Sequence, residues 1–188
     1  MVLGLNTECG VFGLFSPVKT NLITQMICGL NSIQHRGQES CGISFHSNED
    51  IITYKDIGLI KNVFNKDTII NLEEKYSNIN SIIGHVRYST SGDKKFNKDY
   101  IQPITSQFKN KQKFGVSFNG NIPIIHKLYP NIEVDTYGII ELISQNNNYI
   151  NDILIDFQNK IPGVFCLLVL FNNNIYILRD RYGVRPLS

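Results

Sequence analysis

The sequence contains one long apolar run, VFCLLVLF, from Val164 to Phe171. Successive side chains of a strand point to opposite faces, so a strand here is apolar on both faces and both must be covered. The run Ile175–Leu178 follows across Asn172-Asn173-Asn174, a composition typical of turns, and the two runs are expected to form a hairpin. A membrane span needs roughly 18 apolar residues, far more than this run supplies. The run therefore predicts a buried strand in a sheet that is packed on both sides.

The other apolar patterns predict strands that pair in hairpins and helices that fall in separate groups. Strands are expected at 11–15, 42–45, 51–54, 81–86 and 114–118, the last of them ending in a tight turn at Asn119-Gly120. Helices are expected from 22 to near Gly37, at 66–77, at 135–144 and from 150 to the stop at Pro162-Gly163, with an exposed loop at 92–113. This grouping is typical of an α+β fold with layered packing, not of alternating βαβ units.

Length and composition restrict the class of protein further. The chain has 188 residues, which suits one domain, and 42% of them are hydrophobic, which is enough for a core. The formal net charge is only +2, from 18 basic and 16 acidic side chains, which argues against a dedicated nucleic-acid binder. Residues 1–8 carry neither the basic region nor the apolar stretch of a signal peptide.

The four cysteines are too few for a disulfide scaffold, and none of them has metal-site spacing. We expect Cys28, Cys41 and Cys166 to be reduced and buried, as small core residues of a cytoplasmic protein. Cys9 gains interest if residues 1–8 are removed, because it then carries a free α-amine beside its thiol. An α-amine with a pKa near ~8 can accept the thiol proton, and the thiolate can attack a carbonyl. While Glu8 is attached, the nitrogen belongs to an amide and cannot act as a base.

Two arginines and one Asn-Gly pair are further candidates, each with a plain structural alternative. Arg36 and Arg87 follow buried elements and could grip a carboxylate in two parallel hydrogen bonds, or form structural ion pairs. Asn119 and Gly120 could supply a side-chain amide and a backbone N–H to an oxyanion, with glycine allowing an unusual backbone angle, or form a simple turn. Asp135 could pair with a substrate ammonium or cap a helix.

Five sequence blocks, taken in order, resemble one family. They are ECGVFG (8–13), HRGQES (35–40), GHVRYST (84–90), FNGN (118–121) and RDRYGVRPL (179–187). The chain resembles the glutamine-hydrolysing domain of glutamine phosphoribosylpyrophosphate amidotransferases, which are class II (N-terminal cysteine) enzymes of purine synthesis. The resemblance implies a four-layer αββα Ntn-hydrolase sandwich. It also implies that residues 1–8 are a propeptide that is removed and that residues 9–188 form the glutaminase domain.

The resemblance assigns the reaction to three residues. Cys9 would be the nucleophile that attacks the side-chain amide of glutamine, releasing ammonia and leaving a thioester that water hydrolyses to glutamate. Asn119 and Gly120 would form the oxyanion hole. The residue before Asn119 is usually His in this family; here it is Phe118, which is expected to alter packing near the hole.

The resemblance also assigns substrate binding. Arg87, with Thr90 nearby, would hold the α-carboxylate of glutamine, and Asp135 would hold its α-amine. Arg36 and Gly37 would line the site near the nucleophile. The segment between the FNGN block and Asp135 is shorter than usual in the family. No metal is implied in this part of the enzyme.

The family continues into a phosphoribosyltransferase domain, which is absent from this chain. The resemblance therefore implies a partner domain or subunit that brings Mg²⁺, and homo-oligomers of the full-length enzyme. In some members it also implies an iron–sulfur cluster, which would need a longer product; this chain needs no cofactor. The chain stops directly after the predicted hairpin, so we expect the domain to be cut short. Two alternatives stay open: a degenerate remnant that binds glutamine or a partner without turnover, and the glutaminase half of another class II amidotransferase.

Overall fold

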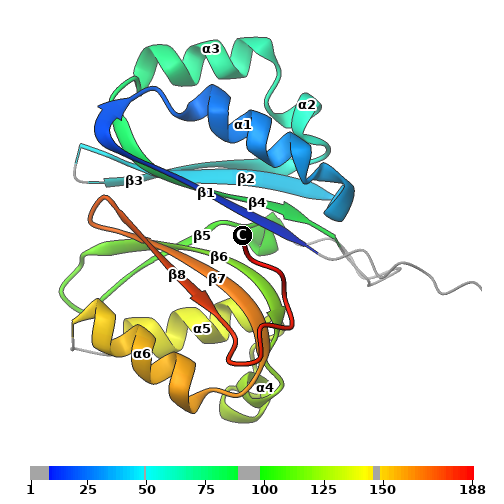
Figure 1. The fold of residues 1–188 in the computed structure, drawn as a ribbon, viewed down its shortest axis with the longest axis vertical. Helices are drawn as coiled ribbons and strands as arrows, with labels where there is room; N and C mark the ends of the chain where they lie inside the picture. The colour runs from blue at the N-terminus through cyan, green and yellow to red at the C-terminus, as the bar shows by residue number, and fades with distance from the viewer. Residues whose placement is uncertain (1–8, 49, 89–97, 146–148) are drawn as a thin grey trace, which may run out of the picture.

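The fold was determined as a computed structural model, which describes residues 9–48, 50–88, 98–145 and 149–188. Four layers follow one another in Figure 1: a helical layer, two sheets that face each other, and a second helical layer. This arrangement confirms the predicted α+β fold with an αββα order of layers. Among the described residues, no helix is long and apolar enough to cross a membrane.

The first half of the chain forms the upper sheet and the helices that cover it (Figure 1). Its strands pair antiparallel in the order β1-β4-β2-β3. The elements are β1 (Gly10–Thr20), α1 (Ile23–Ser32), the 3₁₀ turn η1 (Gln34–Arg36), β2 (Ser40–Ser47), β3 (Asp50–Ile57), α2 (Ile60–Val63), α3 (Lys66–Lys75) and β4 (Ile79–Arg87).

The second half of the chain forms the lower sheet and its helices. The strands pair antiparallel in the order β5-β6-β7-β8. The elements are the 3₁₀ turn η2 (Lys98–Tyr100), β5 (Ile104–Gln107), β6 (Lys113–Asn121), α4 (Ile124–Leu128), α5 (Asp135–Ser144), α6 (Ile150–Lys160), β7 (Val164–Phe171) and β8 (Asn174–Arg179). Each sheet is thus built from one continuous half of the chain.

Strand β7 is covered on both faces, as its apolar run predicted. Phe165, Leu167 and Val169 pack into the core beneath α4, α5 and α6. Leu168 and Leu170, on the opposite face, pack against the upper sheet. Burying such side chains stabilises the fold by roughly 1.5–3 kcal/mol each. The hairpin turn to β8 is confirmed too, because Asn172 and Asn173 both have positive φ values, 47° and 60°.

The layer between the two sheets is more polar than the two layers under the helices. Its apolar cluster has four buried members, Ile51, Ile83, Leu168 and Leu170. Buried polar side chains fill much of the rest of this layer. They include Ser40, Ser44, Ser81, His85 and Ser117, all 0% exposed. We call this layer the inter-sheet seam.

Three expectations from the sequence were wrong. The predicted loop at 92–113 contains strand β5, which pairs with β6 from Ile104 to Gln107; residues 92–97 lie outside the described residues. Asn119-Gly120 is not a turn, because β6 continues to Asn121 in register with β7. Cys28 is exposed, since the buried face of α1 is formed by Ile23, Met26, Ile27 and Leu30, and position 28 turns away from it.

Candidate active site

A cavity of about 280 Å³ collects most of the predicted site residues. Cys9 lies directly before β1, Arg87 ends β4, and Asn119 and Gly120 lie near the end of β6. Asp135 is the first residue of α5. Both sheets and the helices α4, through His126, and α5 therefore contribute polar groups to this cavity, at the end of the inter-sheet seam where the chain enters β1. Thr90 and the predicted propeptide, residues 1–8, lie outside the described residues.

The Cys9 thiol lies 3.7 Å from the carbonyl oxygen of Tyr88. Burial raises the pKa of this thiol, and the nearby positive charge of Arg87 only partly opposes the effect. A buried thiol with a raised pKa is a poor nucleophile by itself, because the thiolate is the reactive form. The Cys9 side chain therefore needs a base beside it before it can attack a carbonyl.

Arg36 and Gly37 lie behind the nucleophile and do not line the cavity. The Nε of Arg36 donates to the backbone carbonyl of Cys9 at 3.3 Å, so it holds the nucleophile's main chain. A side chain at position 37 would collide with the backbone of Val86 and Arg87, 2.6 Å from an added Cβ. Gly37 thus lets η1 pack directly on β4. The expectation that both residues line the site was therefore wrong: Arg36 bonds the Cys9 backbone and Gly37 packs against β4.

The backbone N–H of Gly120 points away from β7. In an antiparallel pair, residues alternate between bonding the partner strand and facing the other way. Phe165 lies opposite Gly120, and both of its backbone groups point away from β6, toward Asp180. Its N–H donates to Asp180 Oδ2 at 3.2 Å, and its carbonyl accepts from the Asp180 N–H at 2.9 Å. The Gly120 N–H therefore faces the side where Tyr100 and Gln102 line the cavity.

Glycine is needed at position 120 because of close packing and not because of an unusual backbone angle. A Cβ there would lie 2.3 Å from the carbonyl oxygen of Val164 and 2.7 Å from the Cα of Phe165. The positive-φ glycines in the described ranges are Gly58 and Gly183. The expected special φ at Gly120 was therefore wrong, although the inward-facing N–H that it was meant to explain is present.

The RDRYGVRPL block forms a loop that supports β7 from behind. Besides its bonds to Phe165, the buried Asp180 accepts from the backbone N–H groups of Tyr182 at 3.0 Å and Val184 at 3.3 Å. Burial opposes ionisation of Asp180, but these backbone donors together hold its pKa below the usual range. Asp180 thus bonds both backbone groups of Phe165, and the N–H of Gly120, on the facing strand, points to the cavity.

Arg87 and Asp135 bring opposite charges to the cavity, and each already has partners within the protein. The Nε of Arg87 lies 3.0 Å from Glu39 Oε2, and its Nη1 donates to the Tyr100 carbonyl at 3.0 Å. Asp135 accepts from the backbone N–H of Ile122 at 2.8 Å. The other carboxylate oxygen of Asp135 lies 3.0 Å from Nε2 of His126.

Sequence reasoning missed several of these partners. Glu39 stands inside the quoted HRGQES block, which was a usable signal for it. His126 and Tyr100 reach the cavity only through tertiary structure and had no local pattern that could reveal them.

His85 is buried completely between the sheets, and its Nε2 lies 3.1 Å from the carbonyl oxygen of Phe118. Burial lowers the pKa of His85 to about 3, and the positive charges of Arg87 and Lys55 act in the same direction. The imidazole is therefore neutral. A carbonyl can only accept, so Nε2 must carry the proton.

We expect His85 to make the protein less stable in mild acid. Its folded pKa lies below the unfolded value of about 6.5, so the unfolded chain takes up a proton that the folded chain does not as pH falls. The free energy of unfolding should drop by about 1.4 kcal/mol per pH unit below about 6.5, or about 2 kcal/mol at pH 5. Urea unfolding of the wild type and His85→Gln at several pH values measures this. Equal pH slopes in the two proteins would contradict the assignment.

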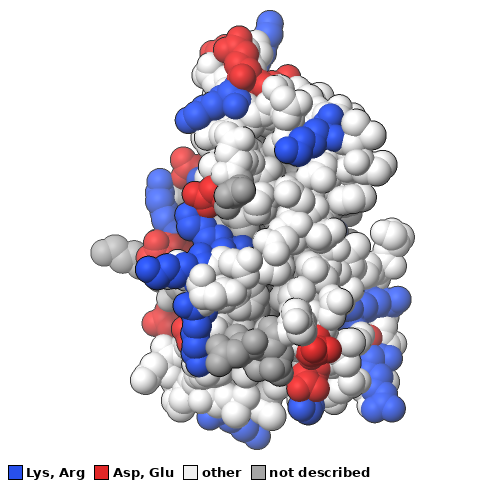
Figure 2. Space-filling model, turned by 90° about the vertical axis from the view of Figure 1, so that its left-hand side faces the viewer, with Lys and Arg blue, Asp and Glu red and all other residues white. Residues whose placement is uncertain are grey.

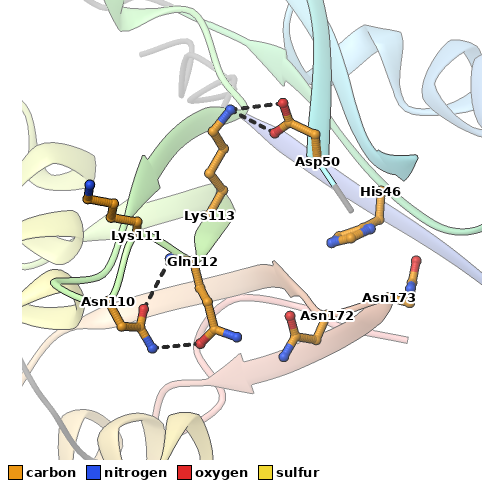
Figure 3. Close-up of a pocket in the computed structure, with 8 residues that line it drawn as sticks. All are labelled: His46, Asp50, Asn110, Lys111, Gln112, Lys113, Asn172 and Asn173. Carbon is orange, nitrogen blue, oxygen red and sulfur yellow. Dashed lines mark hydrogen bonds and ion pairs between the residues drawn. The ribbon is translucent and has the colours of Figure 1, made fainter. Parts of the chain in front are cut away.

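A wider pocket of about 620 Å³ lies among the hairpin turns, at the opposite end of the strands. Figure 2 looks at this end of the molecule, where basic and acidic side chains are mixed along one edge. In Figure 3, Lys113 reaches Asp50, at 2.7 Å and 2.9 Å from its two oxygens, and Asn110 bonds to Gln112. These side chains pair with one another, and no cysteine is among the residues that line the pocket. The groups suited to covalent chemistry lie at the Cys9 end.

Comparison with known proteins gives close agreement in sequence and fold, although no family model matches the chain. An amidophosphoribosyltransferase from Methanothermobacter thermautotrophicus is 33% identical over 96% of this chain, and one from Bacillus subtilis is 30% identical over 100% of it. These matches cover 39% and 40% of the two relatives, so the chain spans about two fifths of their length.

A solved structure shows the same fold. The glutamine phosphoribosylpyrophosphate amidotransferase from B. subtilis, complexed with ADP and GMP, superimposes with a TM-score of 0.77 and 25% identity. The match covers 94% of this chain and 38% of that one. The four-layer fold therefore matches that of the Ntn-hydrolase domain of that enzyme. By sequence and by fold together, the chain matches the N-terminal part of amidophosphoribosyltransferases.

Proposed function

We propose that this chain is the glutamine-hydrolysing part of an amidophosphoribosyltransferase and that Cys9 is its nucleophile. The observation that carries the proposal is the convergence of Cys9, Arg87, Asn119, Gly120 and Asp135 on one cavity. These residues come from distant points of the sequence, and each has a chemistry that amide hydrolysis of a free amino acid needs. The match to amidophosphoribosyltransferases supports the same function.

The reaction follows from the position of each group. Removal of residues 1–8 would give Cys9 an α-amine, which takes the thiol proton and offsets the raised pKa of the buried thiol. The thiolate attacks the side-chain carbonyl carbon of glutamine, forming a C–S bond and a tetrahedral oxyanion. The Asn119 side chain and the Gly120 N–H stabilise that oxyanion. The C–N bond then breaks, ammonia leaves with a proton from the α-ammonium, and water hydrolyses the thioester to glutamate.

Recognition of free glutamine uses the two charged walls of the cavity. The α-carboxylate would share the Arg87 guanidinium with Glu39, and the α-ammonium would bind Asp135 where His126 now lies. A glutamine residue inside a polypeptide carries neither the α-carboxylate nor the α-ammonium, so it would gain neither of these two interactions. The site thus suits the free amino acid better than a peptide.

The ammonia would pass to phosphoribosyl pyrophosphate on a phosphoribosyltransferase domain or subunit, giving phosphoribosylamine. The length of the curated relatives, of which this chain spans about two fifths, supports such a partner. Mg²⁺ would act there, with the pyrophosphate, and the steps at Cys9 use no cofactor.

We place the enzyme in the cytoplasm, because all four cysteines are free thiols, and expect the full-length enzyme to form homo-oligomers.

The direct test is glutamate release by protein that begins at Cys9. L-glutamine should yield equal amounts of glutamate and ammonia, and mass spectrometry after acid quenching should find a glutamyl thioester on Cys9. Folded protein that begins at Cys9 and releases no glutamate would refute the proposal.

Asp135→Asn should weaken glutamine binding strongly. Loss of one member of a buried charge pair costs about 2–5 kcal/mol, or roughly 30-fold or more in KM. Asparagine can still accept the Ile122 N–H bond, so the fold should persist.

Arg87→Lys should raise KM as well, because lysine lacks the planar fork that binds a carboxylate through two bonds. Steady-state kinetics with L-glutamine measures both effects.

Glu39→Gln is the matched control for Arg87. It removes the charge that now pairs with Arg87 but keeps the guanidinium in place. If Arg87 binds substrate, Glu39→Gln should leave KM unchanged or lower it. If Glu39→Gln instead reproduces the defect of Arg87→Lys, the arginine serves only the internal ion pair.

A further inference from the structure

We propose that His85 and Gln102 are positioning residues that hold the oxyanion-binding end of β6 in its active geometry. The inference rests on the proposed function, because it concerns the donors Asn119 and Gly120. Both residues act through the backbone of Phe118, which directly precedes these donors in the chain.

The two side chains hold successive peptide groups. Gln102 Oε1 accepts from the Phe118 N–H at 2.7 Å, which fixes the peptide between Ser117 and Phe118. His85 Nε2 lies 3.1 Å from the Phe118 carbonyl oxygen, which belongs to the peptide that also contains the Asn119 N–H. The orientation of that second peptide sets the direction in which Asn119 and Gly120 continue.

Side chains are needed here because the neighbouring strand ends too early. β5 pairs with β6 only as far as Ile104 opposite Val116. Beyond Val116, β6 has no strand partner among the described residues on the side that faces away from β7. The backbone groups of Phe118 and Gly120 face that side, because alternate residues of a strand bond in opposite directions. Gln102, two residues before β5, and His85, from the other sheet, bond Phe118 in place of the missing strand. The Gly120 N–H is left facing the cavity.

His85 has no competing partner among the described residues. It is 0% exposed, and its other ring nitrogen, Nδ1, has no hydrogen-bond partner there. A buried polar group normally bonds through every atom that it can, and leaving one unbonded costs about 1–3 kcal/mol. The bond to Phe118 is therefore the polar contact that this imidazole makes in the described structure.

Gln102 is held in turn by the upper sheet. Lys55 Nζ donates to the carbonyls of the two flanking residues, Ile101 at 2.6 Å and Pro103 at 3.2 Å. A Cβ at Gly42 would lie 2.6 Å from the Gln102 carbonyl oxygen, so glycine lets this segment approach β2. The end of β6 is thus tied to the upper sheet at two points, through His85 directly and through Gln102 indirectly.

The test separates oxyanion stabilisation from nucleophile reactivity. In protein that begins at Cys9, Gln102→Leu and His85→Leu should each lower kcat for glutamine roughly 10–100-fold with little change in KM, as expected for misplaced donors. Alkylation of Cys9 by iodoacetamide should keep its wild-type rate, because displacement of iodide at carbon develops no oxyanion. Gln102→Glu retains an acceptor for the Phe118 N–H, and His85→Gln retains a donor for the Phe118 carbonyl. Each of these conservative variants should have a higher kcat than the corresponding Leu variant.

Ser81→Ala is the matched control. Ser81 is a fully buried polar residue that lies in the inter-sheet seam and on the same strand as His85. Its replacement by Ala should leave kcat unchanged. Equal losses of kcat and alkylation rate, or a loss in Ser81→Ala as large as in the Leu variants, would overturn the inference.

A second measurement needs no turnover and so distinguishes this inference from the proposed function. Backbone amide NMR of the whole chain should show the Asn119 and Gly120 resonances shifted in Gln102→Leu and Gln102→Glu more than in Ser81→Ala. Unshifted resonances would refute the positioning role even if the enzyme proved inactive. A wild type without glutaminase activity, together with shifted resonances, would refute the proposed function alone.

Discussion

Replacing Cys9 by Ala is expected to lower glutamate release by about 10⁵-fold or more, to the background of the assay, because removing a covalent nucleophile has effects of this size. The variant should fold normally, since the hydrogen bond that the thiol makes among the described residues is a long one, 3.7 Å to the Tyr88 carbonyl. Cys9→Ser keeps the α-amine and a hydroxyl, and is the matched control for loss of the sulfur alone. The measurement is a glutamate assay on protein that begins at position 9.

Wild-type protein that keeps Glu8 should be as inactive as Cys9→Ala. Its nitrogen at position 9 is an amide, and burial raises the pKa of the thiol, so neither a base nor a thiolate is at hand. Intact mass spectrometry before and after the assay shows which form is present. Full activity from protein that still carries Glu8 would contradict the role of the α-amine.

Asn119→Ala should have the second largest effect. Removal of one oxyanion donor costs roughly 10²–10³ in turnover, while the charged groups that bind glutamine stay in place, so KM should change little. Asn119→Asp should be at least as damaging, because it brings a negative charge to where one develops. Kinetics corrected for the folded fraction, determined from thermal melts, test this. Unchanged turnover per folded molecule would assign Asn119 a structural role in β6 alone.

The sequence predicted the layers because hydrophobic periodicity reports burial directly. The run from Val164 to Phe171 required a covered sheet, and the helical spacing that begins at Leu22 predicted α1. Its expected end near Gly37 was wrong, because α1 ends at Ser32 and the 3₁₀ turn η1 follows. Errors arose where pairing with a distant strand overrides local preference. Asn119-Gly120 has turn chemistry but lies in a strand, because β7 provides a partner in register up to Val164.

The candidate site was predicted as residue identities but not as contacts. The blocks contain Cys9 and Arg87, and the resemblance assigned Asp135 outside them; the structure brings all three to one cavity. Their internal partners depend on elements that meet only in the folded state: Glu39 follows η1, and His126 lies on α4, a helix too short to show periodicity.

The small apolar cluster of the inter-sheet seam has a consequence for cooperativity. Each half of the chain buries most of its apolar residues between its own sheet and helices, whereas the apolar cluster between the halves has four buried members, with Val11 and Ile175 packed against them. The sandwich therefore consists of two local folding units joined by a weaker boundary, and opening along that boundary costs less than global unfolding. A glutamine bound to Arg87 on one unit and Asn119 on the other would bridge the boundary, so substrate binding would suppress this opening mode.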